Sequence, residues 1–383
     1  MDVRTKGKAV TLLELFYDLV FVFAISRLTG LLEATQEAGM TLDGAFRYVL
    51  ASFLILQAWL YQTNYNNRFY TGRWYENGVL AVNMMAAIVL ANMIGTDWRM
   101  ADLYFDVMML VVMAGISVLY RVYARRGTDY CREAGRFGYV TAGFAAVYAV
   151  AAMLHLTPVS HLIPAGITAV TIILGAVCSV FVRPDFTTEM VDFHHLTERF
   201  ELLTIATFGE MIVGVAAYFE AGAIDEISIG AFIVILLLFG CYVMHNHYMI
   251  DRHAETHGIV LMYSHYAIVM SLNVVTACQA RLPHSGETEA AVALTMVGAT
   301  LLYFGAVFLN AVYYGRKLWR PAEKGLAAAV LLAGAAIVLI LRSGRACLAG
   351  MLVMSGGLMI LLLWKAHAAR ITCHECEEEE AAA

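Results

Sequence analysis

Residues 11–32 read TLLELFYDLVFVFAISRLTGLL, a run that is long and apolar enough to cross a lipid bilayer as one helix. Similar runs recur along the 383 residues of the chain, of which 61% are hydrophobic and only 15% charged. A mean hydropathy of +0.69 excludes an ordinary soluble globular domain. The runs show no alternation of apolar and polar residues, which excludes a transmembrane β-barrel. The sequence therefore predicts an all-α polytopic membrane protein.

Twelve apolar segments predict about twelve transmembrane helices joined by short loops. The segments are residues 10–32, 45–66, 77–95, 101–123, 136–155, 161–182, 195–219, 226–249, 257–279, 289–314, 323–341 and 347–366. Cytoplasmic loops carry an excess of Lys and Arg, and most of the 25 basic residues fall on the side of the N-terminus. We therefore expect both termini to be cytoplasmic.

Weak internal similarity relates the first six predicted helices to the last six. For example, GVLAVNMMAAIV (78–89) aligns with GIVLMYSHYAIV (258–269). We predict two parallel six-helix repeats, residues 1–190 and 191–370, followed by an acidic, disordered tail at 371–383. Parallel repeats occur in transporters, so the architecture favours transport by analogy.

Three ionisable residues interrupt the first apolar run. Glu14 and Asp18 lie four residues apart and therefore share a helix face, one turn above the other. Because two like charges are costly in a low-dielectric setting, we expect either one protonated carboxyl group or a cation between them. Arg27 lies about half a turn round the helix from Asp18 and cannot neutralise it within the same helix.

The seventh predicted helix, HLTERFELLTIATFGEMIVGVAAYF (195–219), is also charged. Glu210 lies near its centre, and a pseudo-twofold relation between the repeats would let it pair with Arg27. An intramembrane carboxylate costs at least ~2.5 kcal/mol at the middle of a helix, which favours a functional role over one in packing alone. Both interpretations stay open. The candidate residues for an ion, proton or substrate path are Glu14, Asp18, Arg27, Glu198, Glu201 and Glu210.

Histidines suggest an alternative site. In HNHYMIDRHAETH (245–257), His253 and His257 have the i, i+4 spacing that places two imidazoles on one metal if the stretch is helical. The candidate metal ligands are His194, His195, His245, His247, His253 and His257. A polar connector without metal accounts for the same pattern, so no cofactor is predicted and a metal ion stays an alternative. The seven scattered cysteines imply no disulfide framework.

Two segments resemble a known family. LLELFYDLVFVFAISRLT (12–29) and ERFELLTIATFGEMIVG (198–214) are similar to the hallmark segments of the bacterial low temperature requirement A family, the LtrA-like membrane proteins, and NRF (67–69) is also similar. The resemblance extends over nearly the whole chain by helix count and order. It implies that Glu14, Phe16, Asp18, Glu198, Gly209 and Glu210 are signature residues. It also implies a link to growth in the cold, without naming a substrate.

These observations favour a transporter or ion-coupled permease of the bacterial inner (plasma) membrane. One alternative is a membrane-embedded enzyme that uses inner-side His and Glu residues on a lipid or lipid-linked substrate. Another is a membrane sensor or assembly factor that responds to cold or lipid state. The expected partners are membrane lipids and an unidentified small solute or ion, and a homo-oligomer stays open. Without a basic patch that includes aromatic residues, we expect no nucleic-acid partner.

Overall fold

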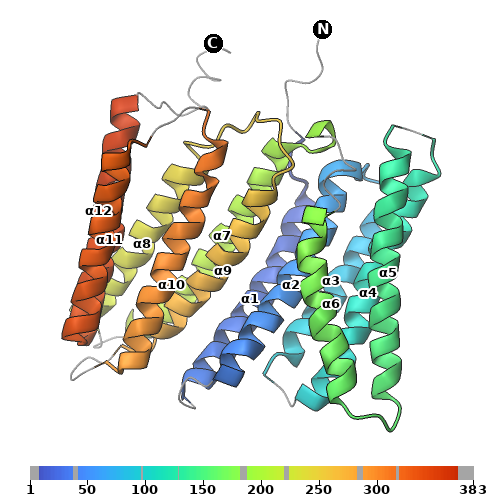
Figure 1. Ribbon diagram of the computed structural model, residues 1–383, viewed down its shortest axis with the longest axis horizontal. Helices are drawn as coiled ribbons and strands as arrows, with labels where there is room; N and C mark the ends of the chain where they lie inside the picture. The colour runs from blue at the N-terminus through green and yellow to red at the C-terminus, as the bar shows by residue number, and fades with distance from the viewer. Residues whose placement is uncertain are drawn as a thin grey trace. The chain divides into compact units, whose positions relative to one another are not determined.

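The computed structural model is all-α, as the sequence predicts (Figure 1). It describes residues 8–37, 42–95, 98–127, 129–181, 188–219, 224–282, 288–315 and 319–369. Within these ranges twelve α-helices follow one another: α1 (Leu12–Glu37), α2 (Leu42–Phe69), α3 (Trp74–Met93), α4 (Trp98–Ala124), α5 (Cys131–His155), α6 (Leu162–Phe181), α7 (Phe193–Val215), α8 (Glu226–Asn246), α9 (Ile259–Gln279), α10 (Ala290–Leu309), α11 (Pro321–Leu341) and α12 (Gly344–Ala369). Short 3-10 segments adjoin α7 and α10.

Ten of the twelve described helices are long and apolar enough to cross a membrane. The other two are α6 and α7. The apolar part of α6 that is described, Leu162–Cys178, is shorter than the ten. α7 has sufficient length, but Glu198, Arg199, Glu201 and Glu210 make it more polar than the others. The prediction of twelve helices is confirmed, and ten of them have the length and composition of membrane spans.

The chain divides into two compact units. Unit 1 comprises residues 1–203 and 255–262, and unit 2 comprises residues 204–254 and 263–383. The repeat boundary between residues 190 and 191, the repeats themselves and the cytoplasmic termini stay predictions. The acidic tail, residues 371–383, lies outside the described residues.

Unit 1 is built around α2, which packs against α1, α3, α4 and α6. From Leu54 to Asn67 every residue of α2 is buried, including five amide side chains and Thr63. Some of these polar groups bond to one another: Asn83 of α3 donates to Gln62 over 2.7 Å, and Gln62 donates to Asn66 over 2.8 Å. α2 therefore carries polar groups through the interior of unit 1.

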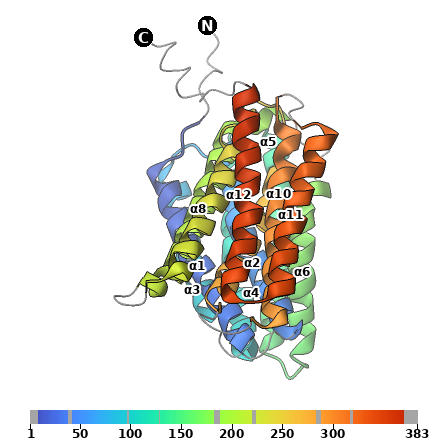
Figure 2. The ribbon, with the colours of Figure 1, turned by 90° about the vertical axis from the view of Figure 1, so that its left-hand side faces the viewer.

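Unit 2 has an apolar interior in which α12 packs against α8 and α11 (Figure 2). The contact between α11 and α12 is made by backbone at Gly334 and Gly350. A Cβ atom at either glycine would lie 2.5 Å from the carbonyl oxygen of the other. Close packing at small residues is a common way to join helices in a membrane, where hydrophobic burial does not drive helices together.

The α11–α12 contact predicts that Gly350→Ala lowers the free energy of unfolding by about 1–3 kcal/mol, because the new methyl group overlaps the Gly334 carbonyl oxygen. Thermal unfolding in detergent micelles, followed by circular dichroism, measures the effect. Gly298→Ala on α10 is the matched control, since a Cβ atom there meets no other group within 4 Å. Equal stability of the two variants would contradict the close backbone contact.

Candidate functional site

Glu14 lies in the first turn of α1, in a capping box formed by the sequence TLLE. Its Oε2 accepts hydrogen bonds from the backbone N and the Oγ1 of Thr11 at 3.0 and 2.9 Å. The Thr11 hydroxyl accepts in turn from the backbone N of Glu14 at 3.3 Å. Such reciprocal bonds satisfy the free amides at a helix start. They leave Oε1 of the fully buried Glu14 for contacts with other helices.

Arg199 of α7 lies between the two carboxylates of α1. Its Nη2 and Nε donate to Oδ1 and Oδ2 of Asp18 at 2.6 and 3.1 Å, and its Nη1 donates to Oε1 of Glu14 at 3.0 Å. The guanidinium is fully buried. This is the second of the two arrangements expected for Glu14 and Asp18, in which a cation lies between them.

Trp59 of α2 completes the surroundings of the pair. Its Nε1 donates to Oδ1 of Asp18 at 2.7 Å, and its ring lies 5.7 Å from the guanidinium carbon of Arg199. Phe200 packs edge-on against the same ring, with centroids 5.0 Å apart. The indole therefore supplies both a hydrogen bond to the carboxylate and a cation–π contact to the guanidinium.

His195, one turn before Arg199, is the titratable neighbour of Glu14. Its Nε2 lies 3.4 Å from Oε1 of Glu14. Its other ring nitrogen, Nδ1, lies 3.1 Å from Nδ2 of Asn67. The backbone N of His195 donates to Oδ1 of Asp192, which caps the start of α7, and Asn67 donates to the Asp192 carbonyl oxygen at 2.7 Å. The imidazole is thus held in place from two helices.

The segment before α1 covers this group. The backbone N of Lys8 donates to Oδ2 of Asp192 at 2.7 Å, and its Nζ donates to the carbonyl oxygen of Asn66 at 2.6 Å. Burial lowers the pKa of the Lys8 ammonium, against the opposing effect of the carboxylates of Glu14, Asp192 and Glu76. The start of α1, the end of α2 and the start of α7 therefore meet at one end of unit 1.

We call Glu14, Asp18, His195 and Arg199 the charged cluster. Two carboxylates and one guanidinium leave one negative charge in excess when the imidazole is neutral. If His195 binds a proton, its positive charge cancels this excess. Its Nε2 lies 3.4 Å from Oε1 of Glu14.

The remaining predicted path residues lie elsewhere. Arg27 is exposed on α1, and Glu198 and Glu201 are half-buried on α7. Glu210 is half-buried on the part of α7 that belongs to unit 2. The pairing of Arg27 with Glu210 stays a prediction.

Of the predicted metal ligands, His195 belongs to the charged cluster. His245 stacks against Trp319, and His247 accepts from Nη2 of Arg252 at 2.6 Å. α8 ends at Asn246 and α9 begins at Ile259, so the stretch with His253 and His257 is not helical and their i, i+4 spacing does not place them on one helix face. His194 is half-buried at the start of α7. Among the described residues, no group of three or more His, Cys, Asp or Glu side chains is placed to hold a metal ion.

Sequence reasoning missed the partners that make the cluster. Neither Arg199 nor Trp59 is among the candidate residues that the sequence predicts. The useful signal was the need for a cation opposite Glu14 and Asp18, because Arg27 cannot reach them. The contacts of Asn67 and Asp192 depend on packing between helices and have no such signal.

The cluster predicts that Arg199→Met costs about 3–5 kcal/mol of unfolding free energy, because it leaves two buried carboxylates without their cation. The triple variant Glu14→Gln, Asp18→Asn, Arg199→Met removes all three charges and recovers most of the loss. Thermal unfolding in detergent checks both. In the control, Arg345→Met breaks an exposed pair with Glu226 and costs at most about 1 kcal/mol. A loss no larger than this control for Arg199→Met would refute the buried pairing.

The lowered pKa of Lys8 predicts a pH effect. The unfolded chain holds the proton up to its ordinary pKa of 10.5, whereas the folded protein releases it at lower pH. Between these two values the unfolded state binds more protons, so stability rises with pH. Lys8→Met should flatten this alkaline rise in melting temperature relative to the unmodified chain. The same rise in both proteins would mean that Lys8 is not its source.

The sequence model of the bacterial low temperature requirement A protein (LtrA) matches residues 9–363, which include both segments that form the charged cluster. No curated protein and no solved structure matched the chain. Because the match covers most of the sequence, this multi-pass membrane protein belongs to the bacterial low temperature requirement A (LtrA) family.

Proposed function

We propose that this LtrA-family protein is a proton-coupled transporter of the bacterial plasma membrane, in which the charged cluster binds the coupling proton. The observation that carries the proposal is the contact of one guanidinium with two carboxylates while a buried imidazole lies 3.4 Å from Glu14. The excess carboxylate charge gives a proton a place to bind, and an imidazole is a side chain that can both accept and donate a proton.

The energetic cost of the cluster supports a use beyond packing. A charged residue in a membrane helix costs about 2.5–3.5 kcal/mol on insertion scales. Apolar side chains of similar volume often stabilise a protein as well as a buried ion pair does. Titratable groups that face the interior of a helix bundle are typical of proton relays in transporters.

In the proposed cycle, a proton on Glu14 or His195 changes how strongly the Arg199 guanidinium binds each of the two carboxylates, Glu14 and Asp18. When Glu14 is ionised, the guanidinium bonds to both carboxylates. A proton on Glu14 removes its charge, so the bidentate contact with Asp18 becomes the main ionic contact of Arg199. Asp192 and Lys8 are charged neighbours of the cluster, and both form hydrogen bonds with backbone groups. In the proposed cycle the cluster therefore alternates between two arrangements that differ by one proton, which is the minimum that coupling requires.

Buried polar groups on α2 and α3 support a path through unit 1. Within the described residues of α2 and α3, eight buried side-chain polar atoms have no hydrogen-bond partner: Ser52 Oγ, Gln57 Oε1, Thr63 Oγ1, Asn66 Nδ2, Asn67 Oδ1, Arg68 Nε, Tyr75 Oη and Asn83 Oδ1. A buried amide or hydroxyl without a partner costs about 1–3 kcal/mol, which water or a polar solute would recover. These atoms favour a hydrated route along α2 over a sealed apolar core.

The test is proton flux into proteoliposomes that hold a pH-sensitive dye, under an imposed pH gradient. We expect Glu14→Gln and His195→Gln each to lower the flux at least about tenfold, since each removes a proton-binding group of the cluster. Asp18→Asn and Glu210→Gln test the other acidic residues of α1 and α7. Arg345→Gln, in the exposed pair with Glu226, is the control and should retain full flux.

Folding is checked for each variant by size-exclusion chromatography and thermal unfolding in the same detergent. Unchanged flux in both Glu14→Gln and His195→Gln would end the proposal. No flux above protein-free liposomes with the unmodified chain would favour the membrane enzyme or the sensor instead.

A further inference from the structure

A second buried acid of unit 1 lies away from the charged cluster, on α4. The side chain of Asp106 is fully buried, and its Oδ1 accepts a hydrogen bond of 2.6 Å from the hydroxyl of Thr168 on α6. In the part of the chain that the structure describes, its other close polar contact is with His155, the last residue of α5. The side chain of Asp106 therefore connects α4 to both α5 and α6.

His155 faces the second oxygen of this carboxyl group. Its Nε2 lies 3.2 Å from Oδ2 of Asp106, and its side chain is only 7% exposed. Neither of these two atoms has a hydrogen-bond partner within the described residues. A neutral imidazole carries one N–H group and a protonated one carries two, so an added proton can reside on the ring or on the carboxyl group. The two groups are therefore placed to share a proton.

The charge of Asp106 depends on that proton. Asp18 in the charged cluster has as its partner Arg199, whose guanidinium is not deprotonated in proteins. Asp106 has an imidazole instead, which is positive only after it has bound a proton. A carboxylate buried beside a neutral imidazole is an uncompensated charge, which a low-dielectric interior strongly disfavours. The pair therefore favours the state with one added proton, held by either group.

Other titratable groups lie within electrostatic range of this pair. Asp102, one turn earlier on α4, has an interaction partner of its own, and His161 is exposed just before α6. On α2, Arg47 is compensated by an ion pair of 2.7 Å with Asp43. The hydroxyl of Tyr148 on α5 is buried and neutral at physiological pH. The contact between the carboxyl group and the imidazole of α5 therefore has the largest influence on where the proton binds.

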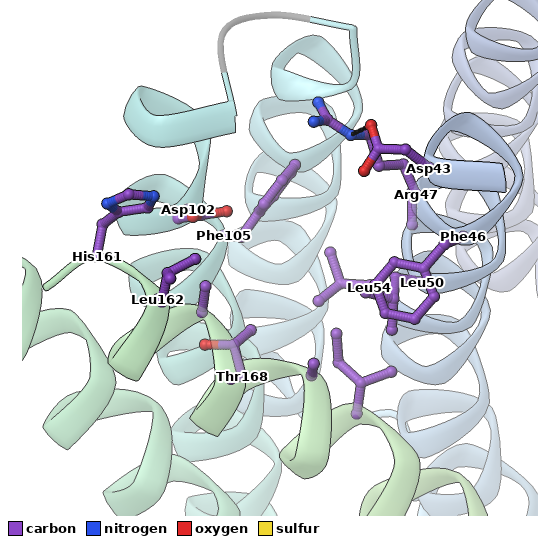
Figure 3. A pocket seen from close by; sticks show the side chains of 15 residues that line it. Asp43, Phe46, Arg47, Leu50, Leu54, Asp102, Phe105, His161, Leu162 and Thr168 are labelled. Atoms are coloured by element: carbon purple, nitrogen blue, oxygen red, sulfur yellow. Dashed lines mark ion pairs between the residues drawn. The ribbon is translucent and has the colours of Figure 1, made fainter. Parts of the chain in front are cut away.

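A cavity of about 690 Å³ opens beside the pair, between α2, α4 and α6 (Figure 3). Its lining includes Thr168, the residue whose hydroxyl bonds to Asp106. Asp102 and His161 lie on one side of it (Figure 3). A cavity of this size is large enough to hold water wherever polar groups line it. The Thr168 hydroxyl thus lies between the cavity and the buried carboxyl group.

Polar groups continue from the cavity along α2. The lining of the cavity ends at Leu54 of α2 and Ile172 of α6. About one turn further on, the amide of Gln57 lies against Gly175, where a Cβ atom would overlap it. Gln62 and the other buried amides follow, in the half of α2 that contacts the charged cluster. The cavity and the charged cluster thus lie toward opposite ends of the same polar helix.

We propose that Asp106 and His155 form a second proton-binding site of unit 1, which takes up and releases its proton through the cavity. The proton binds to the carboxylate or to the imidazole and leaves from the same two groups, so no other bond is made or broken. As one of two proton sites of a transporter, the pair rests on the proposed function. Its binding of a proton does not.

The test is infrared difference spectroscopy of the purified full-length protein in detergent, over the pH range in which it is folded. A carboxylate that binds a proton gains the carbonyl stretching band of a carboxylic acid. We expect Asp106→Asn to lose one such band, because it removes the acid but keeps an acceptor for the Thr168 hydroxyl. Asp102→Asn, the same change one turn earlier on α4, is the matched control and should keep that band.

The partner of the acid is tested by His155→Gln. Without the imidazole, no neighbouring group takes up a proton to compensate an ionised Asp106. We therefore expect the carboxyl group to hold its proton longer, so that the midpoint of its band moves to higher pH by at least about one unit. A purely structural contact, whose protonation does not change, would give no titrating band in either protein.

Access through the cavity is tested by hydrogen exchange. After transfer to deuterated buffer, the band of Asp106 shifts as its carboxyl hydrogen is replaced. Gly166→Leu fills the cavity at a position where a Cβ atom meets no other group within 4 Å, and should slow this exchange at least about tenfold. Gly143→Leu on α5, also at an exposed glycine with no group within 4 Å of a Cβ atom, should leave the rate unchanged.

Proton flux in proteoliposomes tests the role of the pair in transport. We expect Asp106→Asn to lower the flux at least about tenfold. Full flux in this variant would exclude the pair from the proton path. If the unmodified chain shows no flux, the proposed function fails, whereas the infrared spectra still decide whether the pair binds a proton.

Three spectroscopic results would overturn the proposal. They are the absence of a band that depends on Asp106 in both the unmodified chain and His155→Gln, a midpoint that His155→Gln does not move, and unchanged exchange in Gly166→Leu. If Asp106→Asn does not fold, Asp106→Glu assigns the band through its altered frequency, and the other two variants still decide the partner and the access.

Discussion

The shared guanidinium of Arg199 is the interaction on which unit 1 depends. Glu14 and Asp18 occupy one face of α1 and would repel each other in an apolar setting, and Arg199 bonds to both. The cation comes from a helix that begins more than 180 residues later in the chain, so the contact also fixes where α7 begins relative to α1 and α2. Further hydrogen bonds, donated by Trp59, Asn67 and Lys8, hold the neighbouring segments in place around this contact.

Buried polar side chains occur in both units, and unit 2 also has a large apolar core. In unit 1 the amides of α2 form hydrogen bonds within the core, and several of their atoms remain without partners among the described residues. In unit 2, α11 and α12 pack through glycine backbone, and a large cluster of aliphatic and aromatic side chains forms its apolar core.

Much of the fold could be predicted from the sequence because the bilayer imposes a simple rule, about twenty apolar residues for each helix. The same rule drew attention to Glu14 and Asp18, since carboxylates in such a run are costly. The rule could not identify Arg199 as the partner of these two carboxylates. Arg199 lies next to Glu198 on α7, and only the rotation of α7 about its axis decides which of the two is fully buried. The histidine spacing in residues 245–257 would place two side chains on one face only in a helix. This stretch instead connects two helices, so the spacing does not bring His253 and His257 together.

The composition of α7 has a consequence for how the chain enters the membrane. Its charged residues distinguish it from the ten helices that are apolar enough to cross a bilayer unaided. Such a segment partitions poorly from the translocon into lipid when it is alone, because the uncompensated charge of its arginine must enter the hydrocarbon with it. α1 already presents the two carboxylates that compensate this charge. We therefore expect the insertion of α7 to be cooperative, with the earlier helix α1 serving as its binding partner in the membrane.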